Sequence, residues 1–267
     1  MRSLLFVPGS RPDRFAKALA AGADPVCVDL EDAVAPDGKA DAREAVVGAL
    51  RAGDRVGVRV NSVRTEDGSA DLTALAGAPP PAFVMIPKSE DPGDIAAAIH
   101  AVDVPVIALV ETAEGLRNAW DIAAAEGVSA VMFGGGDYAA ELGIAMEFEA
   151  LLFARSQIVA AAARARVPAI DVPWLDVSDP AGLKRETERV KALGYKAKAC
   201  IHPAQLEIVN AVFTPSPDEI ARAKAILQAL EEAQGGAALL NGKLIEKPVA
   251  LGARRTLEAA RSAGRET

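Results

Sequence analysis

The stretch Pro105–Tyr138 reads PVIALVETAEGLRNAWDIAAAEGVSAVMFGGGDY and shows how the chain is built. Two apolar runs, at 105–110 and 129–133, predict buried strands, and a helical segment between them returns the chain to the same edge of a parallel sheet. The first run ends on Glu111, and the second reaches Asp137 after three glycines. Two carboxylates brought to one rim by neighbouring strands predict a site for a hard divalent cation.

The same alternation extends over most of the chain. Apolar runs predict eight strands, and helical segments separate them: 3–7, 25–30, 56–60, 83–87, 106–110, 130–133, 169–173 and 198–202. Continuous apolar strands are typical of a parallel sheet covered on both faces. We therefore predict a (β/α)8 TIM barrel. An open doubly wound sheet is the alternative, which the strand number and the lack of a dinucleotide-binding fingerprint disfavour.

Composition narrows the function classes. Apolar residues form 51% of the 267 residues, which suffices for one large barrel core, and the formal net charge of −8 argues against nucleic acid as partner. No apolar run reaches membrane-spanning length. The two cysteines, Cys27 and Cys200, lie in apolar runs and are expected to be buried thiols of a reduced, cytoplasmic protein.

We expect two domains, a catalytic barrel over residues 1–215 and a C-terminal helical extension over 216–267. The extension contains a capped amphipathic helix from Pro215, the glycine-rich segment GGAALLNGKLIEKPV and a last helix. A barrel closes without such a tail. The tail therefore either crosses onto a neighbouring subunit or packs on its own barrel.

The carboxyl ends of barrel strands form the active-site rim. Residues expected there offer many acids and few cations, with no Ser or Cys nucleophile beside a base: Asp29, Glu31, Asp32, Arg59, Asn61, Lys88, Glu111, Asp137, Asp171 and His202. This set favours metal-assisted chemistry on an oxyanion substrate. Capping of the following helices is the alternative role for Glu111 and Asp137. Gly135 and Gly136 are expected to offer backbone amides to an anion.

Arg59 ends its strand in the sequence Arg-Val-Asn, where a guanidinium can grip a carboxylate and stabilise developing charge. An ion pair with Asp32 or Glu31 is the alternative. Asp32 and the acids before it are candidates to orient Arg59 or hydrogen-bond metal-bound water. Arg14 and Lys17 suit a phosphorylated carrier, unless they form only a solvated basic face. A lone His202 is more often structural.

Several motifs recur in order along residues 2–215 as in one known family: RSLLFVPGSRPDRFAKA, DLEDAVAPDGKADAR, RVN, MIPKSE, ALVETAEGL, FGGGDYAAELG and KACIHPAQ. The chain resembles citrate lyase beta-subunit-like proteins, a group that includes malyl-CoA and citramalyl-CoA lyases. It is more distantly similar to the HpcH/HpaI aldolases.

The resemblance implies a Mg²⁺-dependent carbon–carbon lyase acting on a CoA or acyl-carrier thioester. By this resemblance Glu111 and Asp137 ligate the metal and Arg59 holds the keto acid. Members form homotrimers or hexamers in which a C-terminal segment covers the neighbour's active site. That segment resembles DGxMIDxP in active acyl-CoA lyases, and its second Asp is the acid/base. Here the sequence is NGKLIEKP, so Glu246 takes that position.

The resulting prediction is cleavage of a citryl-, malyl- or citramalyl-type thioester into an acyl thioester and oxaloacetate, glyoxylate or pyruvate. Arg59, Asp32 and Glu246 are the expected catalytic residues. A thioester hydrolase or a malate-synthase-like condensing enzyme on the same site is one alternative. A non-catalytic subunit that binds a keto acid or carrier is another, supported by the altered tail motif.

Overall fold

The computed structural model describes residues 1–234 and 236–265, and the chain divides into two compact units, Met1–Val209 and Asn210–Thr267. The first unit contains a closed barrel of parallel strands in which each strand pairs with the next and β8 pairs with β1. The strands are β1 (Ser3–Pro8), β2 (Val26–Asp29), β3 (Gly57–Arg59), β4 (Val84–Ile86), β5 (Val106–Val110), β6 (Val128–Phe133), β7 (Ala169–Asp171) and β8 (Ala197–Cys200). The predicted TIM barrel is confirmed, and the open sheet is wrong.

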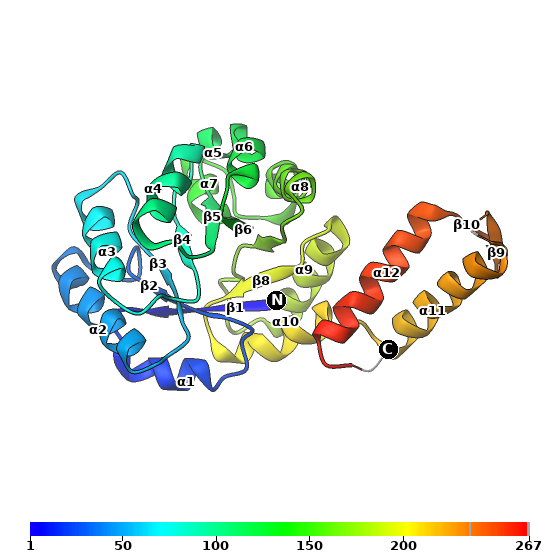
Figure 1. Cartoon of the computed structure of the whole chain (residues 1–267), viewed down its shortest axis with the longest axis horizontal. Coiled ribbons are helices and arrows are strands. Elements are labelled where there is room, and N and C mark those ends of the chain that lie inside the picture. Colours follow the sequence, from blue (N-terminus) through cyan, green and yellow to red (C-terminus); the bar gives the residue numbers. More distant parts are fainter. Residues whose placement is uncertain (235, 266–267) are drawn as a thin grey trace. The chain divides into compact units, whose positions relative to one another are not determined.

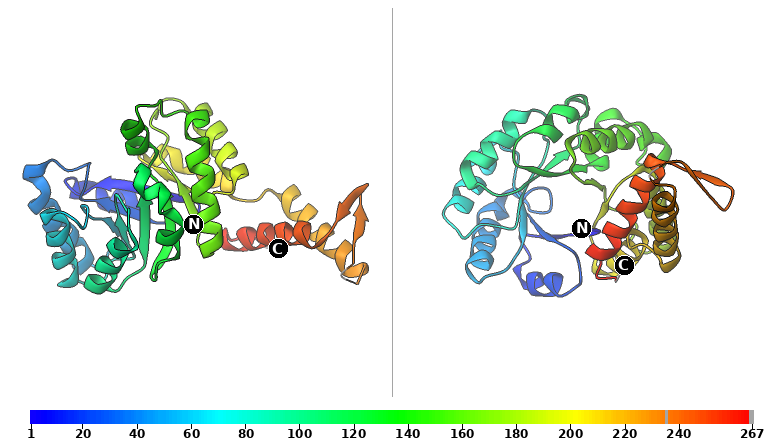
Figure 2. Two further views of the ribbon diagram at one scale, coloured as in Figure 1. Left: turned by 90° about the horizontal axis from the view of Figure 1, so that it is seen from above. Right: turned by 45° about the vertical axis from the view of Figure 1, so that its right-hand side comes forward.

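Helices surround this barrel (Figures 1 and 2). They are α1 (Phe15–Leu19), α2 (Lys39–Arg51), α3 (Glu66–Ala76), α4 (Pro92–Val102), α5 (Ala113–Arg117), α6 (Ala119–Ala124), α7 (Gly135–Leu142), α8 (Phe148–Ala165), α9 (Pro180–Leu193) and α10 (Leu206–Phe213), with 3-10 turns η1 (Pro12–Arg14), η2 (Pro36–Gly38) and η3 (Pro203–Gln205). The single helix expected between Pro105 and Tyr138 is two short ones, α5 and α6, which meet at Asn118.

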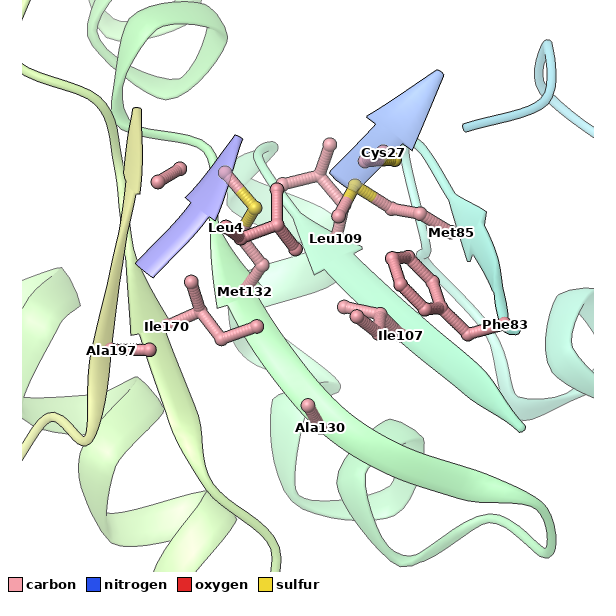
Figure 3. Packing of buried hydrophobic residues seen from close by; sticks show 11 residues of the cluster. Leu4, Cys27, Phe83, Met85, Ile107, Leu109, Ala130, Met132, Ile170 and Ala197 are labelled. Carbon is pink, nitrogen blue, oxygen red and sulfur yellow. The ribbon is translucent and has the colours of Figure 1, made fainter. Parts of the chain in front are cut away.

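Small and large side chains together fill the barrel interior, as Figure 3 shows. The buried cluster consists of inward-facing strand residues and of Phe83, which directly precedes β4: Leu4, Cys27, Phe83, Met85, Ile107, Leu109, Ala130, Met132, Ile170, Ala197 and Ala199. Gly57 leaves room for a ring, since a Cβ there would lie 2.1 Å from Cζ of Phe83. The interior is therefore a packed core, and ligands have access only at its rim.

The second unit is a helical hairpin closed by two short strands. After the end of α10, it contains α11 (Pro217–Glu232), β9 (Ala238–Leu240), β10 (Lys243–Ile245) and α12 (Lys247–Ser262). Asn241 and Gly242 both have positive φ, 49° and 73°, as a two-residue hairpin turn between antiparallel strands requires. Ile226, Leu230 and Ile245 lie in its own small core.

Candidate active site

The inward-facing positions of the strands continue beyond the apolar core into the rim and become polar there. Leu109 faces inward, so the same period of two turns Glu111 inward; Cys27 likewise leads to Asp29. Together with Arg59 they border a cavity of about 410 Å³ at the carboxyl end of the barrel. The cavity is lined by Phe6, Pro8, Asp29, Asp32, Ala33, Arg59, Leu109, Glu111, Met132, Gly134, Gly136, Asp137, Val172, Pro173 and Ile201.

Arg59 is held from several sides. Its Nε and Nη2 donate to the two oxygens of Asp29 at 2.7 and 2.6 Å, and Nη1 lies 2.9 Å from Oε2 of Glu31. The guanidinium also lies over the ring of Phe6, 5.2 Å from its centre. Burial opposes its charge, but the hydrogen bonds and charges of Asp29 and Glu31 prevail and raise the pKa of Arg59. Arg59 thus forms the ion pairs with Glu31 and Asp32 that were the alternative to a role in binding, and it also lines the cavity.

Asp29, Glu31 and Asp32 differ in how fully they are engaged. Asp29 accepts from the backbone N–H groups of Glu31 and Ala33 as well as from Arg59, so both of its oxygens have two donors. Oε2 of Glu31 is buried without a hydrogen bond from a described residue, although its ion pair with Arg59 is close. Asp32 is 61% exposed and lies 3.8 Å from Nη1 of Arg59. Asp32 is therefore the least engaged of these three acids.

Glu111 is buried at the mouth of the barrel and 4% exposed. Its Oε1 accepts a 2.8 Å hydrogen bond from the backbone N–H of Lys88. Burial raises the pKa of Glu111 to about 8, with further contributions from the charges of Glu31 and Asp137, while the Lys88 hydrogen bond and Arg59 act against the rise. The side chain of Thr112 caps α5, so the capping role considered for Glu111 is wrong.

Asp137 lies in the first turn of α7, a helix that starts directly at Gly135. No side-chain capping bond is made at the N-cap, Gly134, so Asp137 is not the capping residue. Its Oδ2 lies 3.4 Å from Nζ of Lys88. The sequence predicts that Lys88 lies on the rim but not that it contacts Asp137, because strand spacing gives the position of a residue and not which groups a long side chain reaches.

The three glycines have different surroundings. A Cβ on Gly134 would lie 2.4 Å from the Cβ of Glu111 and 2.6 Å from its Oε2, so only glycine fits against this glutamate. Gly136 lines the cavity, and a Cβ there would meet nothing within 4 Å. Gly135 is buried and is not among the cavity-lining residues, so of the two glycines expected to face an anion only Gly136 borders the cavity.

Three more predicted residues are not among those that line the cavity. Arg14 and Lys17 are exposed on η1 and α1, and neither forms a salt bridge with any residue in the described ranges. Glu246 belongs to the second unit, where it is exposed and precedes α12 at its N-cap. Its side chain makes no capping hydrogen bond.

Two other rim candidates have structural roles. Asp171 follows the inward-facing Ile170 and therefore points outward, where it is fully buried and pairs with Arg155 at 2.9 Å and Lys198 at 2.6 Å. Lys198 also donates to the backbone oxygen of Val172, a residue of the cavity wall. His202 uses Nδ1 to accept from the N–H of Ala204 and so caps a 3-10 turn.

The donor set at the mouth fits a hard cation. Four carboxylates line the cavity, those of Asp29, Asp32, Glu111 and Asp137, and the only cationic side chain among its described lining residues is Arg59. Glu31 and Lys88 lie next to this set, since Lys88 forms ion pairs with both Glu31 and Asp137. Among described residues no three His, Cys, Asp or Glu side chains already converge as a cation cage. Magnesium commonly takes one or two protein carboxylates and completes its shell with water or substrate oxygens, so this arrangement suits it.

Comparisons with known proteins place the chain in a family. The model of the HpcH/HpaI aldolase/citrate lyase family matches residues 2–203, which comprise nearly the whole barrel. The chain belongs to this family. The resemblance recognised in the sequence motifs is thereby confirmed.

Members of the HpcH/HpaI family with high similarity include a (3S)-malyl-CoA thioesterase of Cereibacter sphaeroides, 40% identical over 97% of this chain and 94% of that protein. A citrate lyase subunit beta-like protein of Mycobacterium tuberculosis is 38% identical over 98% of this chain and 96% of its own.

Two solved structures of M. tuberculosis proteins extend the comparison. CitE in complex with magnesium, acetoacetate and coenzyme A has a TM-score of 0.87 and 37% identity, covering 97% of this chain and 98% of its own. A citrate lyase beta subunit with oxaloacetate and magnesium has a TM-score of 0.73 and 38% identity, covering 80% and 97%. Among the described residues of the present chain, no helix combines the length and apolarity needed to cross a membrane.

Proposed function

We propose that the protein is a Mg²⁺-dependent carbon–carbon lyase. It would cleave a 3-hydroxyacyl-CoA thioester into a keto acid and an acyl thioester. The observation that carries the proposal is the pairing of Glu111 and Asp137 with Arg59 around one cavity at the barrel mouth. Solved family members that contain magnesium with acetoacetate and coenzyme A, or with oxaloacetate, support the substrate class.

Glu111 and Asp137 would hold magnesium, which when bound polarises the oxygens of the keto-acid portion. Arg59 would bind the carboxylate of that portion and stabilise its charge, because the guanidinium is already oriented by Asp29 and Phe6. The backbone N–H of Gly136, at the start of α7, adds a donor for the same anionic group.

Asp32 would take the proton from the substrate hydroxyl, since it borders the cavity and is the least engaged acid there. Loss of that proton lets the hydroxyl-bearing carbon become a carbonyl as the carbon–carbon bond breaks. The bonding electrons pass to the acyl thioester, which leaves as an enolate. Glu246, supplied by a neighbouring subunit of a trimer or hexamer, would protonate this enolate. Arg14 and Lys17 would contact phosphates of the carrier.

The test is a panel of citryl-, malyl- and citramalyl-CoA with purified protein and Mg²⁺, followed by identification of the keto acid released. We expect oxaloacetate, glyoxylate or pyruvate from one member of the panel, and no release after chelation of the metal or in Asp137→Asn. Keto acid release by Asp137→Asn at the wild-type rate would refute the assignment of the site.

Thioester hydrolysis is the second candidate, favoured by the name of the Cereibacter sphaeroides relative. A hydrolase would release free CoA thiol and the intact hydroxy acid from the same panel. Thiol release without keto acid would therefore show that the protein is a thioester hydrolase and not a lyase.

A further inference from the structure

Lys88 contacts both carboxylates that we assign to the metal. Its backbone N–H donates to Oε1 of Glu111 at 2.8 Å. Its ammonium lies 3.4 Å from Oδ2 of Asp137 and 3.2 Å from Oε1 of Glu31. One residue therefore links the ends of β2, β5 and β6 across the barrel mouth.

The backbone of Lys88 has a left-handed conformation that allows both contacts. Its φ is +47°, in the left-handed region that favours glycine and disfavours a long side chain. Such a conformation persists where the surrounding structure over-determines it, and it is commonest at functional sites. Here the turn after β4 directs the N–H toward Glu111 while the side chain reaches Asp137.

Arg59 and Lys88, the two cations next to these carboxylates, are not equally free to move. Arg59 is 13% exposed, and each of its three nitrogens already contacts Asp29 or Glu31. The Lys88 side chain is 42% exposed and has a flexible four-carbon stem. A divalent cation attracted to Asp137 competes with the Lys88 ammonium for the same carboxylate, whereas the ion pairs of Arg59 with described residues are with Asp29, Glu31 and Asp32.

We propose that Lys88 is the resident counter-ion of this site. Its ammonium compensates Asp137 in the metal-free protein and leaves Asp137 when the divalent cation binds, while its N–H continues to hold Glu111. The inference rests on the metal site in the proposed function, but it concerns binding and not turnover. It follows that Lys88 weakens metal binding in the absence of substrate and stabilises the acidic cluster while no metal is bound.

The experiment is a calorimetric titration of the purified protein with Mn²⁺ in the absence of thioester. Lys88→Met keeps the length of the side chain and the backbone restraint but removes the charge, and we expect it to bind Mn²⁺ about 3- to 5-fold more tightly, the size typical of a partly exposed ion pair. Lys88→Arg retains a cation and should bind Mn²⁺ like the wild type. Lys184→Met is the matched control, because Lys184 is an exposed helix lysine paired only with Glu188 among described residues.

A second measurement separates this role from a general effect on folding. Without metal, Lys88→Met should unfold at lower temperature than the wild type, and saturating Mg²⁺ should raise its midpoint by more than it raises that of the wild type or of Lys184→Met. Equal or weaker Mn²⁺ binding by Lys88→Met would overturn the proposal.

Asp137→Asn locates the measured binding at this site, since it should abolish Mn²⁺ binding. Wild-type protein that binds no Mn²⁺ would overturn both the metal site and the counter-ion role. Absence of lyase activity with normal Mn²⁺ binding would refute the proposed reaction alone.

Discussion

Replacing Glu111 with glutamine should stabilise the metal-free protein at neutral and alkaline pH. Glutamine has the shape of a protonated glutamate, and its amide oxygen can still accept the hydrogen bond from Lys88. It removes the group whose ionisation is opposed by burial and by the charges of Glu31 and Asp137. The substitution therefore relieves an electrostatic cost without opening a cavity.

The direction and size of this change in the free energy of unfolding follow from the pKa of Glu111, which is about 8 in the folded protein against an ordinary 4.5. A carboxyl whose folded pKa is raised contributes stability below its unfolded pKa and loses it as pH rises through the folded one. At about 1.4 kcal/mol per pH unit, this interval corresponds to about 4–5 kcal/mol. Because the side chain borders a cavity that can admit water, we expect about 2–3 kcal/mol at pH 8.

The assay is urea unfolding of chelator-treated Glu111→Gln and wild-type protein between pH 5 and pH 8. The stability difference should be close to zero at pH 5 and grow in favour of the variant toward pH 8. Glu114→Gln is the control, because Glu114 is exposed and paired with Arg117, a contact that lowers its pKa. A pH-independent difference, or a less stable Glu111→Gln at pH 8, would show that the ionisation of Glu111 does not destabilise the fold.

Three further predictions concern single residues. Arg59→Lys should lower keto acid release by about 100-fold, because an ammonium cannot form the two-point contact that a guanidinium makes with a carboxylate; steady-state rates check this, and activity close to wild type would contradict it. Gly134→Ala should lower the free energy of unfolding by about 1–3 kcal/mol through the clash of its Cβ with the neighbouring glutamate; Gly136→Ala, whose Cβ meets nothing within 4 Å inside helix α7, should not lower the thermal midpoint. Lys198→Met should cost about 3–5 kcal/mol in urea unfolding, because it leaves a fully buried carboxylate with one cation fewer; a loss below about 1 kcal/mol would show that the buried pair contributes little.

The fold could be predicted from the sequence because every strand of the barrel is an apolar run followed by a helical segment. The same rule located the ends of β2, β3, β5 and β6, and so brought Asp32, Arg59, Glu111 and Asp137 to one cavity. Apolar spacing specifies these features locally, without knowledge of what packs against them.

Features set by tertiary contacts could not be predicted in the same way. Asp171 stands at a strand end like Glu111, but it points outward to Arg155, and one residue of register decides between the two faces. Capping by Asp137 would place the helix start after Asp137, but α7 starts at Gly135, directly after Gly134, which packs against Glu111. The hairpin turn at Asn241 carried a local signal that sequence reasoning missed.

We propose that the residues around one cavity at the barrel mouth break a carbon–carbon bond. The most direct measurement follows keto acid and free thiol together during complete conversion of the best thioester with Mg²⁺. We expect one keto acid for each thioester consumed, with the CoA remaining acylated and no thiol released. Release of one thiol for each thioester, with the hydroxy acid intact and no keto acid formed, would contradict it.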